Sequence, residues 1–542
     1  MKLSLLLAVA GIAALPALAG AVQAVADPAL KTDPAEASAA CAAPMAQTRH
    51  AVKLSSGTLS YTARAGLLPI RDTQTGRLHG CIFYVAYLHT EAATKTPRGP
   101  RPLTFIWNGG PGANSTYLHL EAFGPRRLIS GALPTDPEPS PLALEDNPNT
   151  LLDQSDLVFL DPVGTGFSRI GPAGNEAEFF NTIGDAASVA EAVRVYRQRF
   201  DAERAPLFLM GESYGVWRAA SVAQTLEEHG TQVSGVVLIS GGIPVGPVLA
   251  PELKTALFIP NRTAAAFAFG KLAPDLQGDF SHATDLATRW ATDVYAPALS
   301  RAESLSPDER ADIVRQLSRF TGLPQNLIDP QTLVVPRSLI TKALLADQHK
   351  SLGVLDVRVT EPDTTSAART RLIERYLRQD LGFTDKLAYL GIGDDGYAPL
   401  GSPPASMNDI GEGWNYNLPP GVKPLTAPDK AAHPTAAAAF AAAMDGPPGG
   451  SQPWLIRASK IDPKIKALVV AGWFDSLNSC AGNDYLVAHL DEPLRRNMTA
   501  ICYRSGHMIY RDRDGRFALR ADLRTFYDKV GYDKAGRPGE AP

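Results

Sequence analysis

The chain has 542 residues, of which 45% are hydrophobic and 20% are charged, as is typical of a large soluble globular protein. This length allows two or three domains, or one large domain that carries an insertion. The formal net charge is −4 and there is no long basic run, so nucleic-acid binding has no electrostatic support and we expect no such partner.

Residues 1–26 have the pattern of a secretory signal peptide. A lysine supplies the positive charge, residues 3–15 are an apolar stretch, and small-residue cleavage sites end at Ala19 and at Ala26. An uncleaved membrane anchor is the alternative, because the apolar stretch nearly reaches spanning length, but a proline and scattered small residues weigh against it. We expect a secreted or periplasmic protein without stable membrane association after cleavage, and a flexible lead-in over 27–48.

The first structured segment is predicted to be an antiparallel pair of strands. Residues 50–64 and 78–90 alternate in polarity and are rich in β-formers, and a turn-like segment at 72–76 lies between them.

Short apolar segments then alternate with helical patterns. Strands are predicted over 103–107, 156–160, 206–210, 236–240, 466–471 and 498–503, and helices over 184–200, 214–228 and 517–530. Strands that alternate with helices predict an α/β fold with a doubly wound, mostly parallel sheet.

One long segment interrupts this alternation. Residues 243–455 are rich in proline, alanine and helix formers and contain no clear core strand. We interpret the segment as a large, mainly helical insertion, or lid, above the sheet. A separate downstream domain fits less well, because strand patterns resume after it. The core is therefore predicted to be split between 49–242 and 456–535, with a flexible tail over 536–542.

The sequence Gly-Glu-Ser-Tyr-Gly at 211–215 is a candidate nucleophile elbow. The bare Gly-x-Ser-x-Gly pattern is weak evidence, since it arises by chance roughly 0.2 times in a chain of this length. Here, however, a predicted strand leads into it and a predicted helix leaves it, which is the context that the elbow requires. Bulky side chains at 211 and 215 would clash with neighbouring backbone. Ser213 is therefore the candidate nucleophile.

A serine nucleophile needs a base, and the base needs an acid to orient it. Two histidines follow the resumption of strands. His507 lies in a loop directly after a predicted strand, whereas His489 lies in a helical stretch that favours a structural role. Asp475 follows the strand over 466–471 and is the candidate acid, although such an aspartate is often a helix cap. Asp484 is the competitor and lies deeper in the following segment.

Three motifs together resemble the serine carboxypeptidase family of the α/β-hydrolase superfamily. They are Asn-Gly-Gly-Pro-Gly at 108–112, Asp-Pro-Val-Gly-Thr-Gly-Phe-Ser at 161–168, and Gly-Glu-Ser-Tyr at 211–214. Asp475 with Asn478 and Gly-His-Met at 506–508 are similar to the family's acid and histidine loops. The resemblance suggests a secreted member of bacterial type and covers about 90–250 and 460–530; no motif matches within the insertion.

The resemblance implies a role for each matched residue. Ser213 would be the nucleophile, His507 the general base and then acid, and Asp475 its orienting partner. The backbone N–H groups of Gly110 and Tyr214 would form the oxyanion hole.

The resemblance also implies a pocket for the free C-terminal carboxylate of a peptide. Asn108 and Glu212 would bind this group, with Gly109 and Met508 beside them. Because burial and a like-charged neighbour raise a carboxyl pKa, a protonated Glu212 could donate to the substrate carboxylate at acidic pH. The plainer interpretation is that Glu212 only complements a helix dipole.

Three positions depart from the family pattern. Ile106 stands where the family has tryptophan, Ala113 where it has a disulfide cysteine, and Tyr510 where it has proline. These departures leave the triad intact but put the carboxylate pocket in doubt.

Four cysteines allow three disulfide pairings, and four buried thiols are an equal alternative. The cysteines are Cys41, Cys81, Cys480 and Cys502. A bridge between Cys480 and Cys502 is one hypothesis, because these residues flank the Asp475 and His507 loops, which must meet if the triad exists.

The predicted function is that of a serine carboxypeptidase that needs no metal or organic cofactor. Its partners would be peptides with a free C-terminal carboxylate. Ester hydrolysis or acyl transfer with the same triad is the first alternative, and a non-enzymatic binding protein on a hydrolase scaffold is the second.

Overall fold

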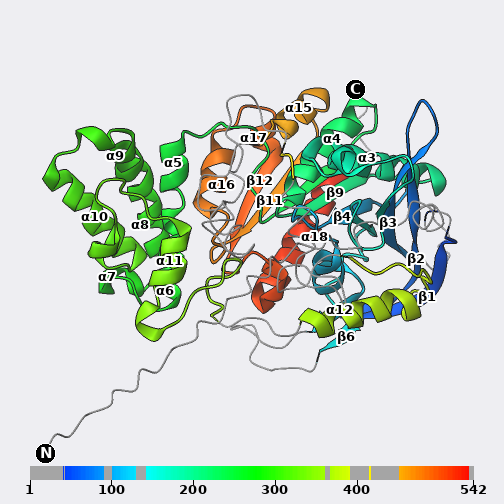
Figure 1. Cartoon of the computed structure of the whole chain (residues 1–542), viewed down its shortest axis with the longest axis horizontal. Helices are drawn as coiled ribbons and strands as arrows, with labels where there is room; N and C mark the ends of the chain where they lie inside the picture. Colours follow the sequence, from blue (N-terminus) through cyan, green and yellow to red (C-terminus); the bar gives the residue numbers. More distant parts are fainter. Residues whose placement is uncertain are drawn as a thin grey trace, which may run out of the picture.

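The computed structural model describes residue 41 and residues 43–90, 100–129, 142–360, 366–390, 414–416 and 451–535 (Figure 1). The predicted signal peptide at 1–26, most of the lead-in and the tail at 536–542 lie outside the described residues, as does part of the predicted insertion.

The described residues form a ten-stranded sheet in the order β1-β2-β3-β7-β4-β9-β10-β11-β12, with β8 paired to β3. The pairs from β7 through β12 are parallel, whereas β1, β2 and β3 are antiparallel. The strands that position the site are β4 (Leu103–Trp107), β7 (Asp156–Asp161), β9 (Leu207–Glu212), β10 (Gly235–Ile239), β11 (Lys466–Gly472) and β12 (Met498–Tyr503). This is the predicted α/β-hydrolase fold.

The N-terminal strands of the sheet differ in one respect from the prediction. The segment 50–64 is not one strand, because β1 (Ala46–Leu54) ends within it and β2 (Gly57–Arg71) begins. The chain reverses in a two-residue turn at Ser55 and Ser56, after which Gly57 pairs with Leu54. Gly57 has a φ of 131°, a conformation that glycine adopts far more readily than other residues. The predicted turn at 72–76 does connect β2 to β3 (Leu78–His89).

Helices cover both faces of the sheet and bury two apolar layers. One layer packs α3 (Thr182–Arg199), α4 (Gly215–Glu228) and α15 (Trp454–Ile461) against the sheet. The other contains apolar side chains of α18 (Arg513–Ala535) and of the π-helical turn η1 (Leu118–Phe123). Buried strands such as β4 (Leu-Thr-Phe-Ile-Trp) are nearly all apolar because both faces are covered.

Between β10 and α15 the described residues are mainly helical, and these helices lie in two places. The helices from α5 (Pro251–Ala256) to α11 (Arg337–Ala343) share a core of their own and extend beside the sheet (Figure 1). The helix α12 (Ser366–Arg375) continues into Tyr376 and Leu377, which pack into the core of the sheet. The domain boundaries at 243 and 455 stay a prediction.

Two disulfides join the four cysteines, Cys41 to Cys81 and Cys480 to Cys502. The alternative of four buried thiols is therefore wrong. Cys480 begins α16 (Cys480–Ala488) and Cys502 lies in β12, so the second bridge connects the segments that carry Asp475 and His507.

Candidate active site

Ser213 occupies a sharp turn between β9 and α4. Its φ is 59°, in the left-handed region that non-glycine residues rarely adopt. Its N–H donates to the carbonyl of Ile239 at the end of β10, at 2.9 Å, which anchors the turn to the neighbouring strand. A partly exposed serine in this backbone conformation has the geometry of a nucleophile elbow.

The two glycines around the serine are required by close backbone approaches. A Cβ at Gly211 would lie 2.0 Å from the carbonyl oxygen of Gly215, and one at Gly215 would lie 2.7 Å from that of Asn108. Larger residues at either position would force the elbow apart, as the sequence predicted.

The loop after β4 lies directly against the elbow. A Cβ at Gly109 would come within 2.6 Å of the backbone nitrogen of Tyr214 and 2.9 Å of the Cβ of Ser213. Among the described residues, the N–H groups of Gly110 and Tyr214 donate to no partner. They are therefore available to a developing oxyanion, and we propose that they form the oxyanion hole.

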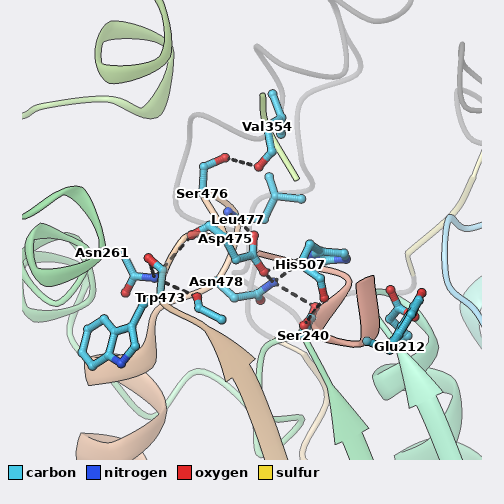
Figure 2. Close-up of polar contacts among 12 residues, drawn as sticks. Glu212, Ser240, Asn261, Val354, Trp473, Asp475, Ser476, Leu477, Asn478 and His507 are labelled. Atoms are coloured by element: carbon cyan, nitrogen blue, oxygen red, sulfur yellow. Dashed lines mark hydrogen bonds and ion pairs between the residues drawn. The ribbon is translucent and has the colours of Figure 1, made fainter. Parts of the chain in front are cut away.

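Asp475 and His507 form a buried pair at the carboxyl ends of β11 and β12. The Nδ1 atom of His507 lies 2.8 Å from Oδ2 of Asp475. Asn478 donates from Nδ2 to the same oxygen, also at 2.8 Å. Figure 2 shows Asp475 and Asn478 on one side of His507 and Glu212 on the other. This contact assigns the proton to Nδ1 of His507 and leaves Nε2 as the basic atom.

Opposing effects act on the pKa of His507. Burial disfavours the imidazolium, but the Asp475 carboxylate, its hydrogen bond and the charge of Glu212 together raise the pKa above its usual value. A raised pKa makes the imidazole a stronger base toward a serine hydroxyl, although a larger fraction is protonated at acidic pH.

The structure links Ser213 to the His507 loop through the end of β10. The hydroxyl of Ser240 donates to the carbonyl of His507 at 2.6 Å, and Asn478 donates to the carbonyl of Ser240 at 2.8 Å. No hydrogen bond joins the side chains of Ser213 and His507 among the described residues. Catalytic hydrogen bonds are often loose without substrate, so this absence does not remove either residue as a candidate.

The two competing residues lie elsewhere. Asp484 is on an exposed face of α16. His489 follows that helix, where its ring stacks on Tyr485 at 4.0 Å and bonds to the Tyr485 carbonyl. Within the described residues, neither forms a hydrogen bond with Ser213, Asp475 or His507.

Asn108, Glu212 and Tyr510 form a buried cluster next to the elbow. Nδ2 of Asn108 donates to Oε2 of Glu212 at 3.0 Å, and the hydroxyl of Tyr510 donates to the same oxygen at 2.8 Å. Burial is the largest influence on Glu212 and raises its pKa to about 7, although His507, Tyr510 and Arg511 oppose the rise. Glu212 is therefore protonated at acidic pH, as the carboxylate-binding hypothesis requires.

The remaining predicted residue, Met508, is half-buried immediately before the turn η7 (Ile509–Arg511) and packs against the core. The sequence did not identify Tyr510 as a partner of Glu212, although the absence of the family's proline at this position was noted.

Arg218 is a second residue that the sequence did not identify. It is fully buried and donates to Asp185 at 2.8 Å and to the Asn108 carbonyl at 2.7 Å. The spacing of Arg218 one helical turn after Tyr214 was the available signal.

A short segment of the predicted insertion holds the acid and histidine loops together. We call residues 354–358 the strap. The Val354 carbonyl accepts from the hydroxyl of Ser476 at 2.5 Å, and the Leu355 carbonyl accepts from the N–H of His507 at 2.7 Å (Figure 2 shows the first contact). The strap thus contacts the chain next to Asp475 and at His507 itself.

Arg358 secures the end of the strap. Its guanidinium donates to Asp356 and to Asp512, the latter at 3.0 Å, and lies 4.4 Å from the centre of the Phe474 ring. Asp512 belongs to the histidine loop and Phe474 to the acid loop, so one side chain connects both.

We predict that Arg358→Gln lowers kcat more than it raises KM, because it loosens the alignment of Asp475 and His507. Misalignment of catalytic groups by about 1 Å costs on the order of 100-fold in rate. Steady-state kinetics of the variant would show this. Arg315→Gln removes an exposed contact to Asp312 and serves as the control. A rise in KM at unchanged kcat would contradict the prediction.

Comparison with known families gives a match to the first part of the sheet domain. Residues 56–243 match the model of the serine carboxypeptidase family. This region contains Asn108, Glu212 and Ser213 but neither Asp475 nor His507.

Individual relatives match over similar lengths. The pheromone-processing carboxypeptidase of Yarrowia lipolytica is 26% identical over 194 residues, which is 34% of this chain and 27% of that protein. Serine carboxypeptidase-like 50 of Arabidopsis thaliana is 30% identical over 155 residues, or 28% of this chain and 31% of that protein. The chain thus spans less than a third of the length of either relative.

A solved structure, the proline iminopeptidase of Mycobacterium smegmatis, is 12% identical with a TM-score of 0.32, and covers 86% of this chain and 98% of its own. Within the described part of the chain, no helix has the length and apolar character to cross a membrane.

Proposed function

We propose that this protein is a secreted serine carboxypeptidase that removes C-terminal residues from peptides and favours acidic pH. The observation that supports it most is the buried carboxyl group of Glu212, which accepts from Asn108 directly beside the nucleophile candidate Ser213. A buried, protonated carboxyl group next to a nucleophile can donate a hydrogen bond to the terminal carboxylate of a peptide substrate. The similarity of residues 56–243 to serine carboxypeptidases supports the same reading.

The proposed reaction begins at Ser213. Nε2 of His507 takes the proton from the serine hydroxyl as its oxygen attacks the last peptide carbonyl. The N–H groups of Gly110 and Tyr214 stabilise the oxyanion that forms. His507 then protonates the departing amino group, which leaves an acyl ester on Ser213. Water, deprotonated by His507, hydrolyses this ester and restores the enzyme.

Asp475 supports each proton transfer. Its carboxylate accepts from Nδ1 of His507, which keeps Nε2 directed at the reaction and stabilises the imidazolium. The strap and Asn478 hold this pair in place.

The carboxylate clamp determines which peptide bond is cut. If Glu212 donates its proton to the terminal carboxylate, the scissile carbonyl is placed one residue away, over Ser213. Ionisation of Glu212 would put two negative charges in one buried site, so affinity should fall as pH rises past about 7. His507 must be neutral to act as the base, which limits kcat at low pH. These opposite requirements predict a bell-shaped profile of kcat/KM.

The proposed function is tested by product analysis on matched peptides. One peptide carries a free C-terminal carboxylate and the other has the same sequence with a C-terminal amide. We expect release of the last amino acid from the free-carboxyl peptide and much slower reaction of the amide. Equal rates, or preference for a simple ester, would favour the alternative of ester hydrolysis or acyl transfer. If a serine-reactive phosphonate did not label the protein, the binding-protein alternative would be favoured.

The export part of the proposal depends on the signal pattern at 1–26, and two disulfides are compatible with an oxidising compartment. N-terminal sequencing of protein recovered outside the cytoplasm should find the chain beginning after Ala19 or Ala26.

A further inference from the structure

Tyr510 and Asn108 both donate to one oxygen of Glu212 and leave the other oxygen without a donor. The orientation of Asn108 is set by the backbone, because its Oδ1 accepts from the N–H of Leu118 at 3.0 Å. The amide nitrogen must then face Glu212, where it donates to Oε2 at 3.0 Å. An amide NH₂ group has no lone pair to accept a proton, so Oε2 must act as an acceptor in this contact.

The Tyr510 hydroxyl makes the second contact to Oε2, at 2.8 Å. Tyr510 is 1% exposed, and burial together with the neighbouring carboxylates raises its pKa well above its usual value. The hydroxyl therefore keeps its proton, and because it has no other hydrogen-bond partner among the described residues, it donates this proton to Oε2. Its backbone carbonyl accepts from Arg516 at 3.0 Å, which connects Tyr510 to α18.

Oε1 of Glu212 has no donor among the described residues. A proton on Oε2 would face the hydrogens that Asn108 and Tyr510 direct at this oxygen, which is unfavourable. A proton on Oε1 would face neither of these donors. The asymmetry thus defines a carbonyl oxygen, Oε2, and a hydroxyl oxygen, Oε1, within the protonated group.

We propose that Tyr510 is a positioning residue that confines the proton of Glu212 to Oε1, the oxygen that remains available to a peptide's terminal carboxylate. This inference rests on the proposed function, in which Glu212 is the clamp. It makes Tyr510 a determinant of selectivity for free-carboxyl substrates, at the position where the family pattern has proline.

Other charged groups near Glu212 come from the histidine loop and from η1, and they act on its ionisation. His507 and Arg511 of the histidine loop favour the carboxylate, and Glu121 of η1 opposes it. Arg511 is itself paired with Glu121, through Nε and Oε2 at 2.6 Å. These charged groups act on the pKa of the whole carboxyl group, whereas Tyr510 and Asn108 donate specifically to Oε2 and so distinguish its two oxygens.

Tyr510→Phe tests the proposal because it removes only the hydroxyl. The steady-state KM would be measured between about pH 5 and about pH 8 for the free-carboxyl peptide and its amide. Tyr527→Phe is the control, since that hydroxyl is also buried and bonds at 2.7 Å to Thr104, near the start of β4, whereas Asn108 follows the end of that strand.

At low pH we expect the variant's KM for the free-carboxyl peptide to rise about two- to tenfold, the usual worth of one hydrogen bond. The KM for the amide should not change. Because the Tyr510 hydrogen bond lowers the pKa of Glu212, its loss should also move the rise in KM to higher pH, by about one pH unit or less. The control should match the wild type.

Two failures are distinguishable. A wild-type KM that rises with pH while Tyr510→Phe and wild type give superimposable profiles would overturn the role of Tyr510 and leave the proposed function standing. If the wild-type KM for the free-carboxyl peptide did not change with pH, Glu212 would not be the clamp and the proposed function would lose its support.

Infrared difference spectra of wild type and Glu212→Gln provide a measurement that needs no Tyr510 variant. We expect the carbonyl band of protonated Glu212 at the lowered frequency of a group that accepts two hydrogen bonds. A band at the position of an unbonded carbonyl would overturn the proposal, even if Tyr510→Phe failed to fold.

Discussion

Ser213→Ala should lower kcat by about 10⁴-fold or more, the usual effect of removing a serine nucleophile from a triad. The fold should persist, because the elbow is held by the backbone bond from residue 213 to Ile239 and by the close packing of Gly211 and Gly215. Peptide affinity should change little, since the clamp and the candidate oxyanion hole stay in place.

Hydrolysis rates, peptide affinity by calorimetry and labelling by a serine-reactive phosphonate would check this expectation. Ser221→Ala changes a buried serine on α4 outside the site and is the control. If the Ser213 variant kept most of the wild-type activity or still took up the phosphonate, another residue would be the nucleophile.

Asp475→Asn should lower kcat by a similar factor, about 10⁴-fold. Oδ1 of Asp475 accepts from the N–H of Leu477 at 2.8 Å, and Oδ2 accepts from Asn478 and His507. An asparagine must place its NH₂ group against one of these donors. If it faces His507, the imidazole must move its proton to Nε2, which then cannot accept from Ser213.

Measuring kcat and KM of Asp475→Asn for the free-carboxyl peptide at several pH values would test this expectation. KM should stay close to the wild-type value, because Asp475 does not contact the clamp. Asp279→Asn is a suitable control, since aspartate and asparagine cap helix α8 (Phe280–Trp290) equally well. A loss of only a few fold would mean that Asp475 merely caps its loop.

Much of the fold was predictable because its strands are short, apolar and bounded by glycine or polar turns. The strand before Ser213 and the helix after it could be located this way, and so could β4 and β12. The break between β1 and β2 was missed because both strands alternate in the same way and the turn between them has only two residues, Ser55 and Ser56.

The candidate site was predictable where chain order and loop position carry the information, as for Ser213, Asp475 and His507. Contacts between segments distant in sequence were not. The hydrogen bond from Tyr510 to Glu212 joins residues 298 positions apart, and no local sequence pattern predicts such a contact. The strap is still harder to predict, since it acts through the backbone carbonyls of Val354 and Leu355, which any sequence supplies.

The dependence of KM on pH in wild type and Glu212→Gln tests the carboxypeptidase proposal most directly. A glutamine can place its carbonyl oxygen where Oε2 accepts from Asn108 and Tyr510, and its NH₂ group where Oε1 faces the substrate. It keeps a donor but cannot ionise. KM must be used, because protonation of His507 limits kcat at low pH.

We predict that wild-type KM for the free-carboxyl peptide is lowest at acidic pH and rises as pH passes about 7, where Glu212 ionises. The same measurement on the amidated peptide should be nearly flat, and Glu212→Gln should flatten the profile of the free-carboxyl peptide. A wild-type KM that stayed constant for the free-carboxyl peptide between about pH 5 and about pH 8 would contradict the proposal that Glu212 binds the substrate's terminal carboxylate.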